Sequence, residues 1–143
     1  MPIFKDFIES TGVKKGDFGI EVTETAELNN LSLASLRLSS IKNLGVSIAL
    51  DDFGAGYSAL RYLKDLPIDL LKLDKSFTTE MAETHNQSLI QIAKLMADSL
   101  SMEFICEGLE EEWQIEKAIS LGCERGQGYF LHKPCSLEDL TNE

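Results

Sequence analysis

Positive charge is scarce in this sequence. The 143 residues include 24 Asp and Glu but only 13 Lys and Arg, which gives a formal net charge of −11. Such a chain repels nucleic-acid backbones and anionic membranes, so it lacks the electrostatic signature of a DNA- or RNA-binding protein. An acidic protein that binds a phosphate ester must invert the charge locally, and a divalent metal ion commonly does so.

Cysteine is also rare. The three cysteines, Cys106, Cys123 and Cys135, are widely spaced and form no CxxC pair. This pattern argues against a disulfide framework and against a zinc site. We expect buried or half-buried free thiols.

Long apolar runs are absent. No stretch approaches the roughly 20 residues that a membrane span needs. The first residues, MPIFKD, do not place a basic region before an apolar one, as a secretory signal does. We therefore expect no membrane segment and a cytoplasmic location. With 43% hydrophobic residues, the chain can bury the core of a single globular domain over residues 1–143.

Short apolar strands alternate with helical patterns along the chain. Strands are predicted at 18–22, 46–50, 70–73, 103–106 and 128–131. Helices are predicted around 4–8, over 31–44 and 58–64, from 86 or 88 to 100, over 111–121 and after 136. This alternation is typical of right-handed βαβ units with a parallel sheet, but periodicity alone does not separate a doubly wound sheet from a barrel.

Charged and amide side chains follow the predicted strands where each one ends. They are Glu21 and Glu24, Asp51 and Asp52, Lys72 and Asp74, Glu107 and Glu110, and Gln127 beside the last strand. Carboxyl ends of parallel strands meet at one edge, where α/β proteins bind ligands. Because clustered acids repel one another unless cations hold them, and because they offer only oxygen ligands, the pattern favours Mg²⁺ or Mn²⁺.

Helix capping and solvated turns are the alternative explanation. They account well for Asp74, Glu111 and Glu112, and they could account for Glu24. They do not account for Asp51 and Asp52, two adjacent acids at the end of a buried strand. The kinase motif DFG at 52–54 lacks the Gly-rich loop, HRD and APE motifs around it, which excludes a kinase.

Five segments, in order, resemble the motifs of the EAL domain family, the class I cyclic di-GMP phosphodiesterases. They are IEVTE at 20–24, DDFGAGYSAL at 51–60, LPIDLLKLD at 66–74, CEGLE at 106–110 and QGYFLHKP at 127–134. The resemblance covers essentially the whole chain. It implies a TIM-type (β/α) barrel that opens cyclic di-GMP to linear pGpG with two Mg²⁺ or Mn²⁺ ions.

The resemblance also implies roles for individual residues. The implied metal ligands are Glu21, Asp51, Asp52 and Glu107. Lys72 would hold and help to activate the attacking water, and Glu107 would serve as the general-base element. Glu24 and Glu110 would support neighbouring loops. Gln127 would contact Glu107 without binding a metal ion itself. The implied substrate contacts are Asp74, Gln127 and Lys133.

The resemblance is incomplete. The family's Glu-Ala-Leu strand and its Asn metal ligand have no counterpart here, and Cys106 stands where the family motif has Ala. A complete barrel takes about 250 residues. We therefore expect an α/β fold with about five βα units of a partial barrel, the C-terminal part of an EAL domain. Whether such a chain is an enzyme stays open, and we expect it to be inactive alone.

Two other interpretations remain. The first is a non-catalytic, EAL-derived binding or regulatory module in cyclic di-GMP signalling. The second is an unrelated α/β metal protein, against which the five ordered motifs argue. A partial barrel also leaves open sheet edges at the strands through Ile20 and Tyr129. We expect its uncovered inner face to include Ile48, Leu50, Leu71, Leu73 and Ile105. Such a surface predicts a homodimer or pairing with another chain.

Overall fold

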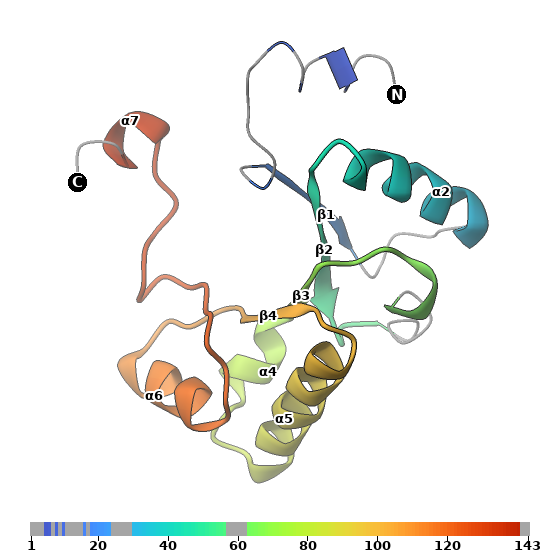
Figure 1. Ribbon diagram of the computed structural model, residues 1–143. Coiled ribbons are helices and arrows are strands. Elements are labelled where there is room, and N and C mark those ends of the chain that lie inside the picture. The colour runs from blue at the N-terminus through green and yellow to red at the C-terminus, as the bar shows by residue number, and fades with distance from the viewer. Residues whose placement is uncertain are drawn as a thin grey trace.

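A four-stranded parallel sheet forms the centre of the computed structural model (Figure 1). The structure describes residues 5, 6, 8, 10, 16, 18–23, 30–56 and 63–140. The strands are β1 (Gly19–Thr23), β2 (Ser47–Phe53), β3 (Leu70–Leu73) and β4 (Glu103–Cys106), and they are neighbours in that order. The predicted α/β class with parallel strands is confirmed, and the sheet is open among the described residues.

Helices connect and flank the strands. They are α2 (Leu31–Lys42), α4 (Lys75–Thr79), α5 (Thr84–Ser99), α6 (Glu112–Ser120) and α7 (Leu137–Leu140). Figure 1 shows α2 near β1 and β2, and α4, α5 and α6 grouped at the β4 side of the sheet. Within the described residues, each helix is too short or too polar to span a lipid bilayer.

Polar side chains fix where these helices begin. Asn30 accepts a hydrogen bond from the Leu33 N–H at 3.0 Å and so caps α2. Asp74 caps α4 by accepting from the Ser76 N–H at 3.0 Å. Because a helix leaves its first N–H groups without partners inside the helix, such acceptors define its start. The capping interpretation of Asp74 is thus confirmed, although α4 itself was not predicted.

The hydrophobic core lies between the sheet and the helices. Ile48, Leu50, Leu71 and Leu73 are 0–1% exposed, and they pack in one cluster with apolar residues of α5 such as Ile90. The expectation that these four line an uncovered inner face was wrong. Successive side chains of a strand point to opposite faces. The side chains of Ala49, Asp51 and Lys72 therefore lie on the opposite face of β2 and β3.

The predicted fifth strand at 128–131 was also wrong. The chain makes one isolated parallel bridge between Cys106 and Gly126, and residues 128–131 form turns. The Gln127 N–H donates to the Cys106 carbonyl at 2.9 Å, and the Leu109 N–H donates to the Gln127 carbonyl at 3.1 Å. A Cβ at Gly128 would collide with the Leu109 backbone. Glycine there lets the chain turn tightly against the segment that follows β4.

The remaining predicted elements agree closely with the structure where it describes them. The strands predicted at 70–73 and 103–106 have the bounds of β3 and β4. Of the predicted helix around residues 4–8, the structure describes residues 5, 6 and 8, and they are helical. Of the one at 58–64 it describes residues 63 and 64, which are also helical.

Candidate functional site

Lys72 is the centre of an ion-pair cluster at the carboxyl edge of the sheet. It lies on β3 and is 5% exposed. Its Nζ is 2.7 Å from Glu107 Oε1, 2.8 Å from Glu21 Oε1 and 3.0 Å from Asp51 Oδ1. These partners come from β1, β2 and the residue after β4. The predicted convergence of the strand ends on one edge is confirmed.

A β-bulge in β2 places the carboxylates of Asp51 and Asp52 on the same side of the sheet, near Glu107. Leu50 pairs with Leu71 and Phe53 with Leu73, so two residues of β2 stand opposite the single residue Lys72. In a regular strand the two carboxylates would point to opposite faces. The bulge removes that constraint, and Asp52 adopts a φ of 55°, in the left-handed region that Asp tolerates better than most residues.

The resulting carboxylates are spaced to share a cation. One oxygen each of Asp51, Asp52 and Glu107 lies within 4.8 Å of the others. Asp51 Oδ1 is buried and accepts no hydrogen bond of acceptable geometry, although Lys72 Nζ is 3.0 Å away. A buried oxygen without a hydrogen bond is costly in a folded protein. This donor set and its underused oxygen fit Mg²⁺ or Mn²⁺, which take oxygen ligands.

Burial and neighbouring charges act against the ionised forms of two carboxylates of the site. Burial, followed by the nearby charges of Asp51 and Asp74, raises the pKa of Asp52. Burial also raises the pKa of Glu107, against the opposing hydrogen bond from Lys72. For Lys72 burial lowers the pKa, but the close contacts of its ammonium group with the carboxylates of Glu107, Glu21 and Asp51 together raise it above its ordinary value. Lys72 therefore stays charged at neutral pH, while burial disfavours ionisation of Asp52 and Glu107.

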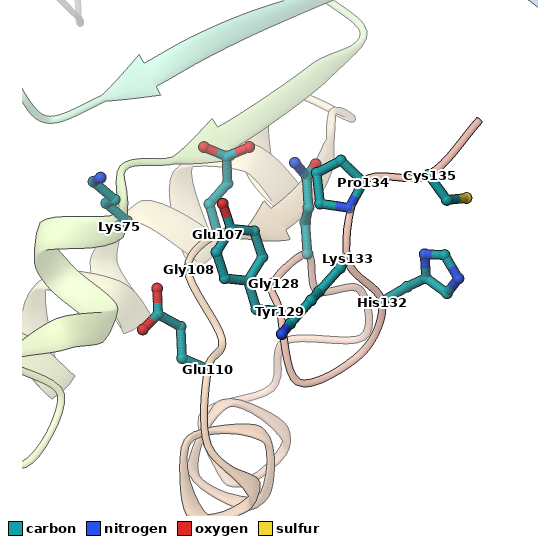
Figure 2. Close-up of a pocket in the computed structure, with 11 residues that line it drawn as sticks. Lys75, Glu107, Gly108, Glu110, Gly128, Tyr129, His132, Lys133, Pro134 and Cys135 are labelled. Atoms are coloured by element: carbon teal, nitrogen blue, oxygen red, sulfur yellow. The ribbon is translucent and has the colours of Figure 1, made fainter.

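A pocket of about 530 Å³ opens beside Glu107 (Figure 2). Lys75 and Glu110 lie on one side of it, and His132 and Pro134 lie on the other. Tyr129, which is 60% exposed, presents its ring there, and Lys133 adds a second ammonium group. Lys75 and Lys133 share the pocket lining with Glu107 and Glu110, so the lysines offer an anionic group local positive charge beside the carboxylates.

Short helix α4 holds the end of β4 in position. Thr78 is fully buried, and its hydroxyl donates to the Glu107 carbonyl. The buried Gln114 side chain of α6 donates to the Thr78 carbonyl at 3.0 Å and accepts from the Glu110 N–H at 2.7 Å. Backbone on both sides of Gly108 is thereby fixed. Sequence reasoning missed Thr78, because a threonine in a helix carries no signal for such a role.

The other predicted site residues are more scattered. Gln127, Glu110 and Lys133 line the pocket rather than the Lys72 cluster. Asp74 caps α4 and is not among the pocket residues. Glu24 lies outside the described residues. Lys75, Tyr129 and His132 line the pocket without having been predicted; the cationic and aromatic character of the first two was the available signal.

Comparison with known proteins gives a consistent result. The EAL domain family model matches residues 1–134. Cyclic di-GMP phosphodiesterase PdeA of Borreliella burgdorferi is 35% identical over 136 residues, which are 92% of this chain and 20% of that protein. The EAL domain structure of Mycobacterium smegmatis DcpA superposes with a TM-score of 0.93 and 30% identity, over 97% of this chain and 63% of that one.

A further structure carries a metal and a nucleotide. Klebsiella pneumoniae BlrP1, in its manganese and cyclic di-GMP complex, superposes with a TM-score of 0.86 and 26% identity, over 94% of this chain and 34% of that one. The present chain spans about a fifth of the length of the curated relatives it matches, from 18% to 20% in three of them. The family match runs over nearly all of its residues, and on that ground this chain is a member of the EAL domain family.

Proposed function

We propose that this chain is the C-terminal part of an EAL-type cyclic di-GMP phosphodiesterase domain. Its carboxylate cluster would contribute to the hydrolysis of cyclic di-GMP to pGpG in the complete domain. The observation that carries the proposal is the arrangement of Asp51, Asp52 and Glu107 around Lys72, with a buried Asp51 oxygen that lacks a hydrogen bond. The name of PdeA and the BlrP1 complex support the same activity and ligand.

Asp51, Asp52, Glu107 and Glu21 are the residues that would hold Mg²⁺ or Mn²⁺. Such ions lower the pKa of water and neutralise charge on a phosphodiester. The protein's own contribution is to keep four oxygen donors at one edge of a sheet. The bulge in β2 does this for the two aspartates, and the end of β4 does it for Glu107.

Lys72 orients the carboxylates and supplies positive charge. Its ammonium group has three N–H donors, and three carboxylates lie within 3.0 Å of it. Because its pKa is raised, Lys72 does not act as a base at neutral pH. Glu107 suits the base role better, because burial raises its pKa towards the range in which a carboxylate accepts a proton effectively.

The pocket beside Glu107 would receive one nucleotide of the substrate. Its volume of about 530 Å³ is in the usual range for small-molecule sites. The Tyr129 ring offers a stacking surface for a base, and Lys75 and Lys133 offer charge to phosphate (Figure 2). Gln127, Asp74 and Lys133 remain our candidates for substrate contacts. Glu24 and Glu110 remain candidates for supporting the neighbouring loops.

The isolated chain should turn over little or no substrate. Its sequence has no Glu-Ala-Leu strand and no counterpart of the Asn ligand. Two ligands are therefore missing from a two-metal site, and the reaction requires both ions.

We also propose that the open sheet edge at β1 pairs with a second chain, as a homodimer or with another polypeptide. A non-catalytic role in cyclic di-GMP binding is the second candidate, favoured by the open sheet.

Calorimetry and a hydrolysis assay separate these candidates. We expect weak cyclic di-GMP binding in the presence of Mn²⁺, reduced at least about tenfold by Lys133→Ala plus Tyr129→Ala, and no pGpG at high protein concentration. Lys64→Ala, outside the pocket, is the control. Clear turnover that Glu107→Gln abolishes would show a complete active site. Unaltered binding by the double variant would remove the pocket from the proposal.

A further inference from the structure

Two thiols lie against each other beneath the candidate site. Cys106 is the last residue of β4, directly before Glu107, and Cys123 lies in the turn after α6. Their Sγ atoms are 3.3 Å apart. The side chains are 0% and 4% exposed, and both cysteines are free thiols. In the EAL motif that this segment resembles, Ala stands in place of Cys106.

The backbone already holds the two cysteines close together. The Cys106 N–H donates to the Arg125 carbonyl at 3.2 Å, and the Cys123 N–H donates to the Ala118 carbonyl at 3.0 Å. A disulfide needs its sulfurs at about 2.05 Å, so these two would have to approach by about 1 Å. Side-chain rotation can supply a movement of that size. The bond would therefore form within the existing fold.

Cys123 is the thiol that a small molecule can reach. It lines a pocket of about 140 Å³ between α6 and the segment that follows it, together with Leu109, Ile119 and Gly126. A water molecule occupies about 30 Å³ of liquid volume, so hydrogen peroxide fits in such a space. Cys106 does not line that pocket. The attack on an oxidant would therefore start at Cys123.

We propose that Cys106 and Cys123 form an oxidation-sensitive pair that hydrogen peroxide converts to a disulfide. The Cys123 sulfur attacks one peroxide oxygen, the O–O bond breaks, and a sulfenic acid and water result. The Cys106 sulfur then attacks the sulfenic sulfur, the S–S bond forms, and a second water leaves with the Cys106 proton. In total the two thiols lose two hydrogen atoms, and one peroxide is reduced to two waters.

The bond would tie the strand end that carries Glu107 to the turn that leads to Gln127. The two cysteines are 17 residues apart, and the closed loop would contain all of α6. Closing such a loop stabilises a fold by restricting the unfolded chain. We expect oxidation to raise the Tm by about 5 °C. This inference rests on the thiol geometry alone, and its test involves neither cyclic di-GMP nor metal.

Mass spectrometry of the peroxide-treated chain tests it. The exposed Cys135 is first changed to Ser, so that it cannot link two chains. Trypsin cleaves after Lys94, Lys117 and Arg125, which places Cys106 and Cys123 in separate peptides, 95–117 and 118–125. We expect an intact mass lower by two hydrogen atoms and a single linked peptide pair that a reductant separates. Cys106→Ala should instead stop at a Cys123 sulfenic acid, which dimedone traps.

Three outcomes would overturn the proposal. One is full alkylation of both thiols after denaturation, at a peroxide dose that oxidises Cys135 in the unsubstituted chain. Another is that the Cys135→Ser chain forms a disulfide only between two chains and none within one chain. The third is an unchanged Tm for a chain whose mass shows the internal disulfide. The bond would then not stabilise the end of β4 as proposed. The intact mass and the peptide analysis need no substitution of Cys106 or Cys123. They therefore test the proposal even if Cys106→Ala fails to fold.

Discussion

Lys72 on β3 and Glu107 after β4 are joined by a 2.7 Å ion pair, and Glu21 and Asp51 complete the ring around the same ammonium group. This single lysine offsets the repulsion among three carboxylates. Its raised pKa has the same origin, since removing the proton would leave three anions without their cation. The cluster is therefore a structural centre as well as a candidate reaction centre.

Replacing Lys72 should destabilise the fold. Lys72→Met keeps the aliphatic stem but leaves Glu107 and Asp51 without their cation, at a cost of about 2 kcal/mol in the free energy of unfolding. The raised pKa of Lys72 means that this contribution is complete at neutral pH and falls only as the pH rises through that folded-state value. Urea unfolding measures the cost. Lys94→Met, in the helix pair with Asp98, is the control, and an equal loss there would contradict the central role of Lys72.

Replacing Asp52 should have the opposite effect. Asp52→Asn removes a charge that burial and Asp51 disfavour, and Asn also suits the positive φ. At neutral pH and with chelator present, we expect a gain of about 0.5 kcal/mol. The electrostatic part of the gain should shrink as the pH falls through the raised pKa of Asp52 and vanish below about pH 3.9, where aspartic acid is protonated in both states. Thermal unfolding across this range, with Asp65→Asn as control, measures it. A gain that does not change with pH would point to the backbone alone.

The buried hydroxyl of Thr78 can be tested with a matched neighbour. Thr78→Val preserves shape but removes the donor to the Glu107 carbonyl, and we expect a loss of about 1–2 kcal/mol. Thr79→Val removes the hydroxyl of an exposed residue on the same helix and should cost much less. Chemical denaturation of both variants gives the comparison. Equal costs would mean that the contact between α4 and the end of β4 contributes little.

Sequence alone predicted the parts of the fold that depend on local pattern. The runs at 70–73 and 103–106 are short, apolar and bounded by polar residues, and they gave β3 and β4 with the observed bounds. The convergence of Glu21, Asp51, Lys72 and Glu107 followed from strand direction, because parallel strands share one carboxyl edge. The oxygen-rich character of the cluster followed from residue type.

What the sequence could not provide depends on contacts between distant segments. The bulge that turns Asp51 and Asp52 to one side appears only in the pairing of β2 with β3. The segment at 128–131 has strand-like residues, but it forms turns, because it is hydrogen-bonded to the backbone of Leu109 in the segment after β4. The 3.3 Å approach of Cys106 and Cys123 joins residues 17 apart and has no signature in their spacing.

The most direct test of the account is Mn²⁺ binding to this chain, followed by the electron paramagnetic resonance signal of free Mn²⁺. The carboxylate cluster predicts saturable binding to the wild-type chain. Asp51→Asn removes the carboxylate whose buried oxygen lacks a hydrogen bond, and affinity should fall at least about tenfold, while Asp65→Asn should bind like wild type. Retained folding of Asp51→Asn is checked by circular dichroism. Equal Mn²⁺ affinity in wild type and a folded Asp51→Asn variant would contradict the metal site at the carboxyl edge of the sheet.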